Sequence, residues 1–179
     1  MQDLDVIKQM VEPLRMKRLQ LEAALDRGGQ GKQIENWMLT EMNAELIDMR
    51  NKRLLLTAEG EHKYPATETG RCDLWWKGDH ETWLEVKTFV LLNKGTKGSR
   101  SALKKDLSKL ATLSVKNTVY SLCILIMSPG SKRLETWKKL IAETAKNSGF
   151  RPVDYADPNI IQEGFEIMLF ERNKTNEDS

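Results

Sequence analysis

The sequence has few of the residues that mark secreted, zinc-binding or membrane-spanning proteins. Its 179 residues include only two cysteines and two histidines, too few for a disulfide framework or for a zinc site with the usual ligand spacing. No run of 18 apolar residues is present, as a transmembrane helix would require. The first ten residues carry acidic side chains where a signal peptide has a basic and then an apolar region. We therefore expect a cytoplasmic protein with no membrane partner.

A large excess of charge of one sign is also missing. Lys and Arg together number 28 and Asp and Glu number 26, which gives a formal net charge of +2. A balance this close does not by itself indicate a nucleic-acid partner. Hydrophobic residues make up 40% of the chain, which argues against a wholly disordered protein. The length fits one compact domain.

The hydrophobic periodicity predicts alternating helices and strands. Apolar residues at helical spacing predict a helix within residues 3–26 that is interrupted by Pro13 and followed by a glycine-rich linker. Further helices are predicted over 33–50, 101–113 and 132–147, and strands over 54–64, 71–76, 82–92, 118–127 and 165–170. The segment 118–127 is almost entirely apolar, which is typical of a strand buried on both faces. This order predicts an α/β fold with a central mixed sheet flanked by helices.

The domain organisation follows from these elements. We expect residues 1–31 to form an N-terminal helical segment and linker, residues 32–172 to form the α/β domain, and residues 173–179 to form a disordered polar tail. The first helix could cover the sheet or pair with a second subunit, and the sequence leaves both alternatives open.

A predicted hairpin carries the residues with the most chemical information. In the strand 82–92, Glu85 and Lys87 point to the same face because side chains alternate along a strand. Asp73 lies on the neighbouring strand, and a suitable register would bring it to the same place. Two close carboxylates attract a hard divalent cation such as Mg²⁺ or Mn²⁺, which can polarise a phosphodiester and activate water. A lysine beside them can orient that water and stabilise the developing charge.

The residues around this hairpin resemble a known signature. The segments Gly70-Arg71-Cys72-Asp73-Leu74 and Trp83-Leu84-Glu85-Val86-Lys87-Thr88 are similar to the D…ExK motif of the PD-(D/E)xK nuclease superfamily, which includes the restriction endonucleases. The resemblance covers about residues 33–127 and implies a restriction endonuclease-like core. It implies that Asp73 and Glu85 bind Mg²⁺ or Mn²⁺, with the Val86 carbonyl beside them, and that Lys87 serves the attacking water. Cys72 departs from the motif, since the family has a proline there that shapes the chain rather than binding metal.

Many members of this superfamily also place an acidic residue on the helix before the hairpin. The candidates here are Glu35, Glu41 and Glu45. At about 100° per residue, Glu35 lies in the middle of the apolar stripe of helix 33–50, whereas Glu41 lies well outside it and Glu45 near its edge. An acidic side chain on a buried stripe needs a partner or a metal ion. We therefore expect Glu35 to complete the acidic cluster.

The segment 86–117 is strongly basic although the whole chain is almost neutral. It contains eight basic residues and one acidic residue, Asp106. It begins in the candidate site and runs through a glycine-rich loop into a helix, as a surface that binds a phosphate backbone requires. The residues expected to contact nucleic acid are Lys94, Lys97, Arg100 and Lys104. An ordinary solvated helix face explains Lys105 and Lys109 well.

The expected function is that of a Mg²⁺-dependent endonuclease acting on DNA. RNA stays open as a substrate because the metal chemistry is the same. A non-catalytic nuclease-fold module that binds nucleic acid or a protein is the alternative, since a fold can be kept while its reaction is lost. Glu and Lys two residues apart also occur on ordinary solvated strands. A homodimer and a subunit of a larger complex are both compatible with the sequence.

Overall fold

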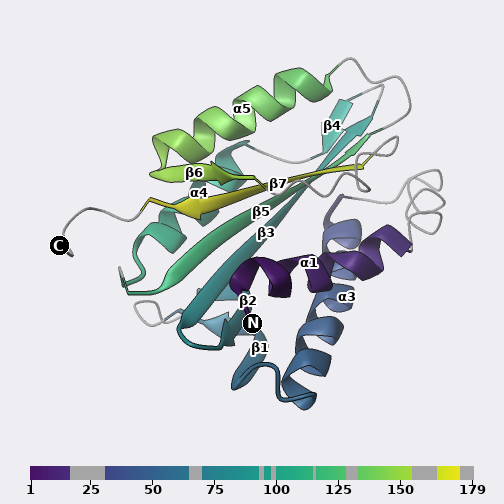
Figure 1. Ribbon diagram of the computed structural model, residues 1–179. Helices are drawn as coiled ribbons and strands as arrows, with labels where there is room; N and C mark the ends of the chain where they lie inside the picture. Colours follow the sequence, from purple (N-terminus) through teal and green to yellow (C-terminus); the bar gives the residue numbers. More distant parts are fainter. Residues whose placement is uncertain are drawn as a thin grey trace.

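The computed structural model of the chain is a mixed sheet with helices on both faces (Figure 1). It describes residues 1–16, 31–64, 70–92, 95–97, 100–114, 116–127, 133–154 and 165–173. The helices are α1 (Asp3–Met16), α3 (Gly31–Asn51), α4 (Arg100–Ala111) and α5 (Leu134–Asn147). The strands are β1 (Thr57–Lys63), β2 (Arg71–Lys77), β3 (Glu81–Leu92), β4 (Gly95–Lys97), β5 (Thr118–Met127), β6 (Phe150–Val153) and β7 (Phe165–Arg172). The predicted α/β class is confirmed.

The sheet has the strand order β1-β2-β3-β5-β7-β6, and β4 pairs with the far end of β3. The central pair β3 and β5 is parallel, and the remaining pairs are antiparallel. A parallel neighbour requires a crossover connection, and α4 supplies it between β3 and β5. The long central strands β3 and β5 therefore position the helix between them and the residues of the candidate site.

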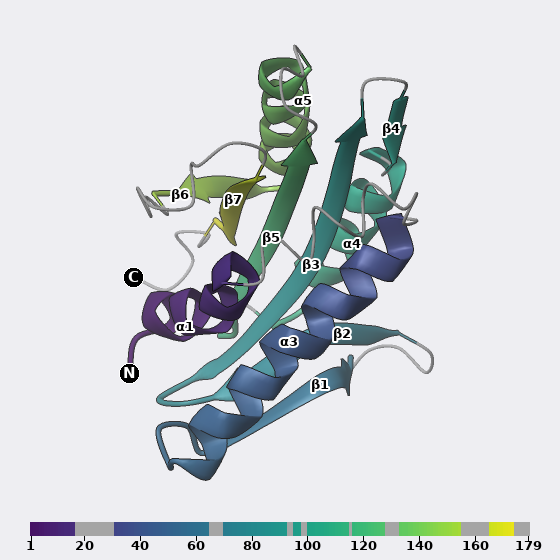
Figure 2. The ribbon, with the colours of Figure 1, turned by 90° about the vertical axis from the view of Figure 1, so that its right-hand side faces the viewer.

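The two faces of the sheet carry separate hydrophobic cores. Leu84, Val86 and Val90 of β3 point toward α1 and α3, whereas Trp83 and Phe89 point toward α4 and α5. Figure 2 shows α1 and α3 in front of the sheet and α4 behind it. The β5 segment from Val119 to Ile126 is buried on both faces, as its apolar composition predicts.

Helix α1 covers the sheet, which is one of the two alternatives left open by the sequence. Its buried residues, which join the core formed with α3, are Val6, Ile7, Met10, Val11 and Leu14. The helix continues through Pro13 to Met16, so the predicted interruption does not divide it into two helices at the proline. Buried side chains on both sides of the proline hold this segment against α3 and the sheet. Residues 17–30, with the predicted linker, lie outside the described ranges.

Several element boundaries differ from the prediction. The strand expected from residue 54 begins at Thr57, because Arg53 has a positive φ of 60° and the following residues form a bend. Strand β6 was not expected, since it has four residues, contains Pro152 and buries only Phe150 fully. Strand β4 lies within the predicted loop 93–101. None of the described helices combines the length and apolar character needed to cross a membrane.

Candidate functional site

The candidate site lies where strands β2 and β3 separate. Their ladder ends at the pair Leu74 and Leu84, and among the described strands none pairs with this edge of β3 until β4 begins opposite Val90. Two carboxylates accept the backbone N–H groups that this stretch of β3 would otherwise donate to a neighbouring strand. Asp73 Oδ2 accepts the Val86 N–H at 2.7 Å, and Glu35 Oε2, on α3, accepts the Thr88 N–H at 2.9 Å.

Asp73 and Glu85 form a carboxyl pair at this opening, as the motif predicts. The two carboxyls lie close enough to shift each other's pKa, and Glu85 is only 5% exposed. Burial, together with the neighbouring Asp73 carboxylate, raises the pKa of Glu85 to about 9. Burial also raises the pKa of Asp73, against the hydrogen bonds that it accepts. The pair therefore retains a proton near neutral pH in the metal-free protein.

Tyr64, immediately after β1, holds Glu85 from the other side. Its hydroxyl donates to Glu85 Oε1 at 2.5 Å, and its ring stacks on Trp83 with the centroids 5.5 Å apart. Burial raises the pKa of Tyr64 above its ordinary value, so the hydroxyl stays protonated and acts as a donor. This residue was missed in the sequence because nothing in its local pattern distinguishes it from a core tyrosine.

Lys87 lies between two carboxylates. Its Nζ is 3.2 Å from Glu35 Oε1 and 3.5 Å from Asp106 Oδ2. Burial alone would lower the pKa of Lys87, but Glu35 and Asp106 outweigh it and raise the pKa. Lys87 is thus a charged ammonium, and the predicted orientation of Glu35 toward the sheet is confirmed.

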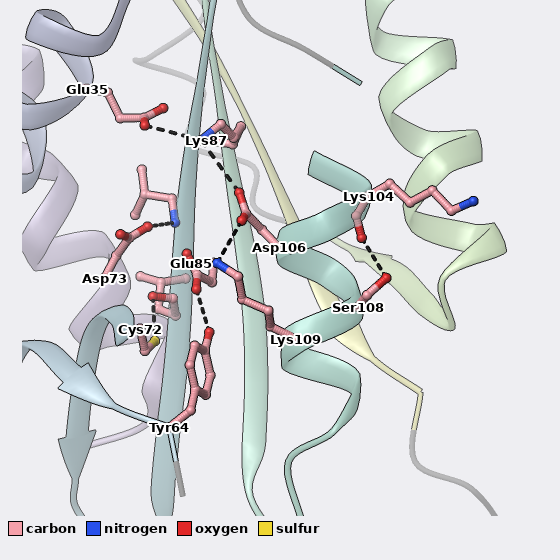
Figure 3. A network of polar contacts seen from close by, with 12 residues as sticks. Glu35, Tyr64, Cys72, Asp73, Glu85, Lys87, Lys104, Asp106, Ser108 and Lys109 are labelled. Carbon is pink, nitrogen blue, oxygen red and sulfur yellow. Dashed lines mark hydrogen bonds and ion pairs between the residues drawn. The ribbon is translucent and has the colours of Figure 1, made fainter. Parts of the chain in front are cut away.

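Helix α4 brings two further charged residues to the site (Figure 3). Asp106 Oδ1 is 3.1 Å from Lys109 Nζ, and its other oxygen faces Lys87. Burial lowers the pKa of Lys109, but Glu85 and Asp106 outweigh it and raise the pKa. Helical phase is the sequence signal that could have found one of them. At about 100° per residue, Asp106 lies next to the buried stripe of α4, whereas Lys109 lies well outside it on the same side, so the phase indicates Asp106 alone.

Two of the four basic residues predicted to bind nucleic acid, Arg100 and Lys104, have described side chains, and neither contacts the carboxylates of the site. Arg100 Nε donates to Thr144 Oγ1 of α5 at 2.9 Å, and the exposed Lys104 extends away from the carboxylates. Lys97 lies in β4 opposite Val90, and Lys94 is outside the described residues. Their contact with nucleic acid stays a prediction. Lys109, explained by a solvated helix face in the sequence, lies in the site instead.

Cys72, directly before Asp73, contacts the backbone of both hairpin strands. Its buried Sγ lies 3.1 Å from the carbonyl oxygens of both Leu74 and Leu84, which its single S–H can contact in turn. These contacts join the two strands at the last pair of their ladder. Burial raises the pKa of Cys72, so the thiol stays protonated. Cys72 thus fixes the point from which Asp73 reaches into the opening.

The donor set suits a hard divalent cation bound largely through water. Within the described part of the chain, no three His, Cys, Asp or Glu side chains gather at one point for a metal ion. Mg²⁺ commonly binds one or two carboxylates and keeps several water ligands. The Asp73 and Glu85 pair can supply those carboxylates. The Val86 carbonyl faces the same open edge as its N–H, because both groups of a strand residue point to the same side.

The net charge of the cluster also favours a divalent cation. Its ionisable groups are the carboxyls of Glu35, Asp73, Glu85 and Asp106 and the ammoniums of Lys87 and Lys109. With every group ionised, the carboxylates exceed the ammoniums by two charges, which a divalent cation would neutralise. The chain matches no protein-family model, no curated protein and no solved structure in the comparisons made.

Proposed function

We propose that the protein is a metal-dependent nuclease that hydrolyses phosphodiester bonds in DNA, built on a restriction endonuclease-like core. The observation that carries the proposal is the close approach of the Asp73 and Glu85 carboxyls where the hairpin opens, with Lys87 two positions further along β3. The three residues come from two strands and lie beside an open sheet edge. The additional contact of Glu35 with Lys87 agrees with the acidic residue that many members of the superfamily place on this helix.

Asp73 and Glu85 would hold Mg²⁺ or Mn²⁺, with the Val86 carbonyl as a further oxygen donor. A bound ion of this kind lowers the pKa of a coordinated water and polarises a phosphoryl oxygen. Tyr64 orients one oxygen of Glu85 through its hydroxyl. The N–H of Val86 orients one oxygen of Asp73. These two contacts leave the remaining carboxylate oxygens to the ion.

Lys87 serves the attacking water and the charge that develops on the phosphate. An ammonium has three N–H donors and no acceptor, so after its contacts with Glu35 and Asp106 one donor remains for a water or a phosphate oxygen. A cation held in place before the reaction costs no reorganisation when negative charge develops. Glu35 and Asp106 supply this preorganisation.

A specific observation favours the alternative, a non-catalytic nuclease-fold module. Lys87 has two carboxylate partners, and ion-pair networks with a structural role look the same. Such a module would bind nucleic acid or a protein equally well without a divalent metal and without Lys87.

The experiment is cleavage of plasmid, single-stranded DNA and RNA with Mg²⁺ or Mn²⁺. We expect cleavage by the wild type that EDTA abolishes, and a loss of about 100-fold or more in Asp73→Ala and Lys87→Ala. The matched controls are Asp79→Ala in the hairpin turn and Lys77→Ala at the exposed end of β2, which should cleave like the wild type. Equal behaviour of all variants would overturn the proposal, and metal-independent binding that survives Lys87→Ala would favour the module.

A further inference from the structure

Helix α4 carries a second lysine of the site, which the motif does not include. Lys109 Nζ is 3.1 Å from Asp106 Oδ1, and Asp106 Oδ2 is 3.5 Å from Lys87 Nζ. One carboxylate therefore joins two ammonium groups, one from β3 and one from α4. Burial lowers the pKa of Lys109, but the nearby Glu85 carboxyl raises it, and the net effect is a rise.

We propose that Lys109 binds a backbone phosphate of the nucleic acid beside the Asp73 and Glu85 pair, and that Asp106 is the positioning residue for both ammoniums. The inference rests on the proposed function and extends it to the residue that receives the substrate. It assigns to α4 a role that the basic loop before it was expected to fill.

The first argument is electrostatic. A phosphodiester carries a negative charge, and an acidic cluster repels it unless cations stand at the place of entry. Lys87 is held by carboxylates on two sides, Glu35 and Asp106. Lys109 has one hydrogen-bonded carboxylate, Asp106, so two of its N–H donors remain for a ligand. Lys109 is the ammonium better able to bind an incoming anion.

The second argument is access. The side chain of Lys109 is 32% exposed, against 20% for Lys87. A ligand that approaches from solvent therefore reaches Lys109 before Lys87. The neighbouring Lys105 is exposed on the same helix, and Lys104 extends away from the site (Figure 3).

The third argument is the double contact of Asp106. A carboxylate and a lysine three residues apart on a helix form an ordinary surface pair. Here the second oxygen of Asp106 contacts Lys87 on another element, and the Asp106 side chain is only 15% exposed. This arrangement fixes the two ammoniums relative to each other. With Lys109 fixed in place to hold a phosphate, Lys87 is left to the attacking water.

The test compares Lys109→Ala, Lys109→Arg and Lys105→Ala in two measurements. The first is binding of a fluorescent DNA duplex with Ca²⁺ in place of Mg²⁺, over a range of salt concentrations. The second is single-turnover cleavage with Mn²⁺. We expect Lys109→Ala to weaken binding about fivefold or more and to reduce the salt slope by about one. Lys109→Arg should restore binding, and Lys105→Ala should match the wild type. Equal binding by Lys109→Ala and Lys105→Ala would overturn the inference.

Asp106→Asn separates positioning from binding. It removes a negative charge, so we expect DNA binding as tight as that of the wild type together with a fall in kcat of about tenfold or more. Asp106→Glu should recover part of the lost rate. An unchanged kcat in Asp106→Asn would show that Asp106 has no positioning role.

The outcomes also separate this inference from the proposed function. If the wild type binds DNA without cleaving it, the nuclease proposal fails, while the comparison of Lys109→Ala with Lys105→Ala still decides the inference. If the wild type binds no DNA with or without a divalent metal, both fail.

Discussion

The carboxylate of Asp73 takes the place of a strand opposite Val86. Its Oδ2 accepts the Val86 N–H at 2.7 Å at the point where the ladder of β2 and β3 ends. An acidic side chain thereby satisfies a backbone donor and remains beside the Glu85 carboxyl. The opening of the hairpin and the assembly of the carboxyl pair are one structural feature.

This relationship predicts the effect of Asp73→Asn on metal binding. The amide oxygen can still accept the Val86 N–H, so the strand opening should be retained while the charge that attracts a divalent cation is lost. We expect the affinity for Mn²⁺, measured by isothermal titration calorimetry, to fall about tenfold or more. Asp79→Asn, in the exposed turn of the same hairpin, is the control. Wild-type affinity in Asp73→Asn would show that Asp73 is not a ligand.

Glu85→Gln should change how stability depends on pH in the metal-free protein. The pKa of Glu85 is about 9 in the folded chain against an ordinary value of 4.5. Between these values the folded state holds a proton that the unfolded state has released, so the free energy of unfolding falls as pH rises. The variant stays neutral at every pH and should be more stable than the wild type at about pH 9. Urea unfolding with EDTA at several pH values measures this.

The control for that experiment is Glu81→Gln, at the exposed start of the same strand. It should keep the pH dependence of the wild type. If the curves of Glu85→Gln and the wild type run parallel, Glu85 does not titrate in this range.

Tyr64→Phe should raise the pKa of Glu85 further. Burial is the main cause of the high pKa, and the Tyr64 hydroxyl opposes it by donating to the carboxylate. Removal of this donor leaves the charged form less stabilised. The measurement is an NMR titration of the Glu85 side-chain carbon in metal-free protein. Tyr120→Phe, on the opposite face of the sheet, should leave the titration unchanged. A fall of the pKa in Tyr64→Phe would contradict the assigned role.

Asp3 should stabilise the docking of α1. Its carboxylate accepts hydrogen bonds from Trp76 Nε1 at 3.0 Å and Thr82 Oγ1 at 2.9 Å, and lies 2.7 Å from His80 Nε2. We expect Asp3→Ala to lower the free energy of unfolding by about 1–3 kcal/mol. Asp5→Ala removes an exposed acid from the same first turn and should cost less. Urea unfolding of both variants checks this, and equal losses would assign the effect to the helix dipole.

Three features of the fold were not predicted from the sequence: strands β4 and β6, and the continuous helix around Pro13. Strands β4 and β6 are short and contribute few buried side chains, so their patterns resemble those of loops. Pro13 predicts a break in an isolated helix, but buried side chains on both sides of it retain the helical path. For β6 and α1, contacts with distant segments outweigh the local preference, whereas β4 pairs with the neighbouring end of β3.

Local periodicity determines much of the candidate site. Alternation along β3 places Glu85 and Lys87 on one face, and the helical phase of α3 directs Glu35 toward the sheet. Both follow from fixed backbone geometry, so the residues alone are enough to predict them. Periodicity states which side chains share a face, but it does not state which faces of separate elements meet.

The meeting of those faces is decided by the tertiary structure. The parallel pairing of β3 with β5 places α4 over the face that carries Glu85, and this brings Asp106 and Lys109 to the site. The end of β1 brings Tyr64 to Glu85 across the sheet. These contacts join residues about 20 positions apart or more, and their geometry depends on the packing of whole elements. The hairpin carries the motif, and the packing of α3, α4 and β1 around it supplies the partners of its charged groups.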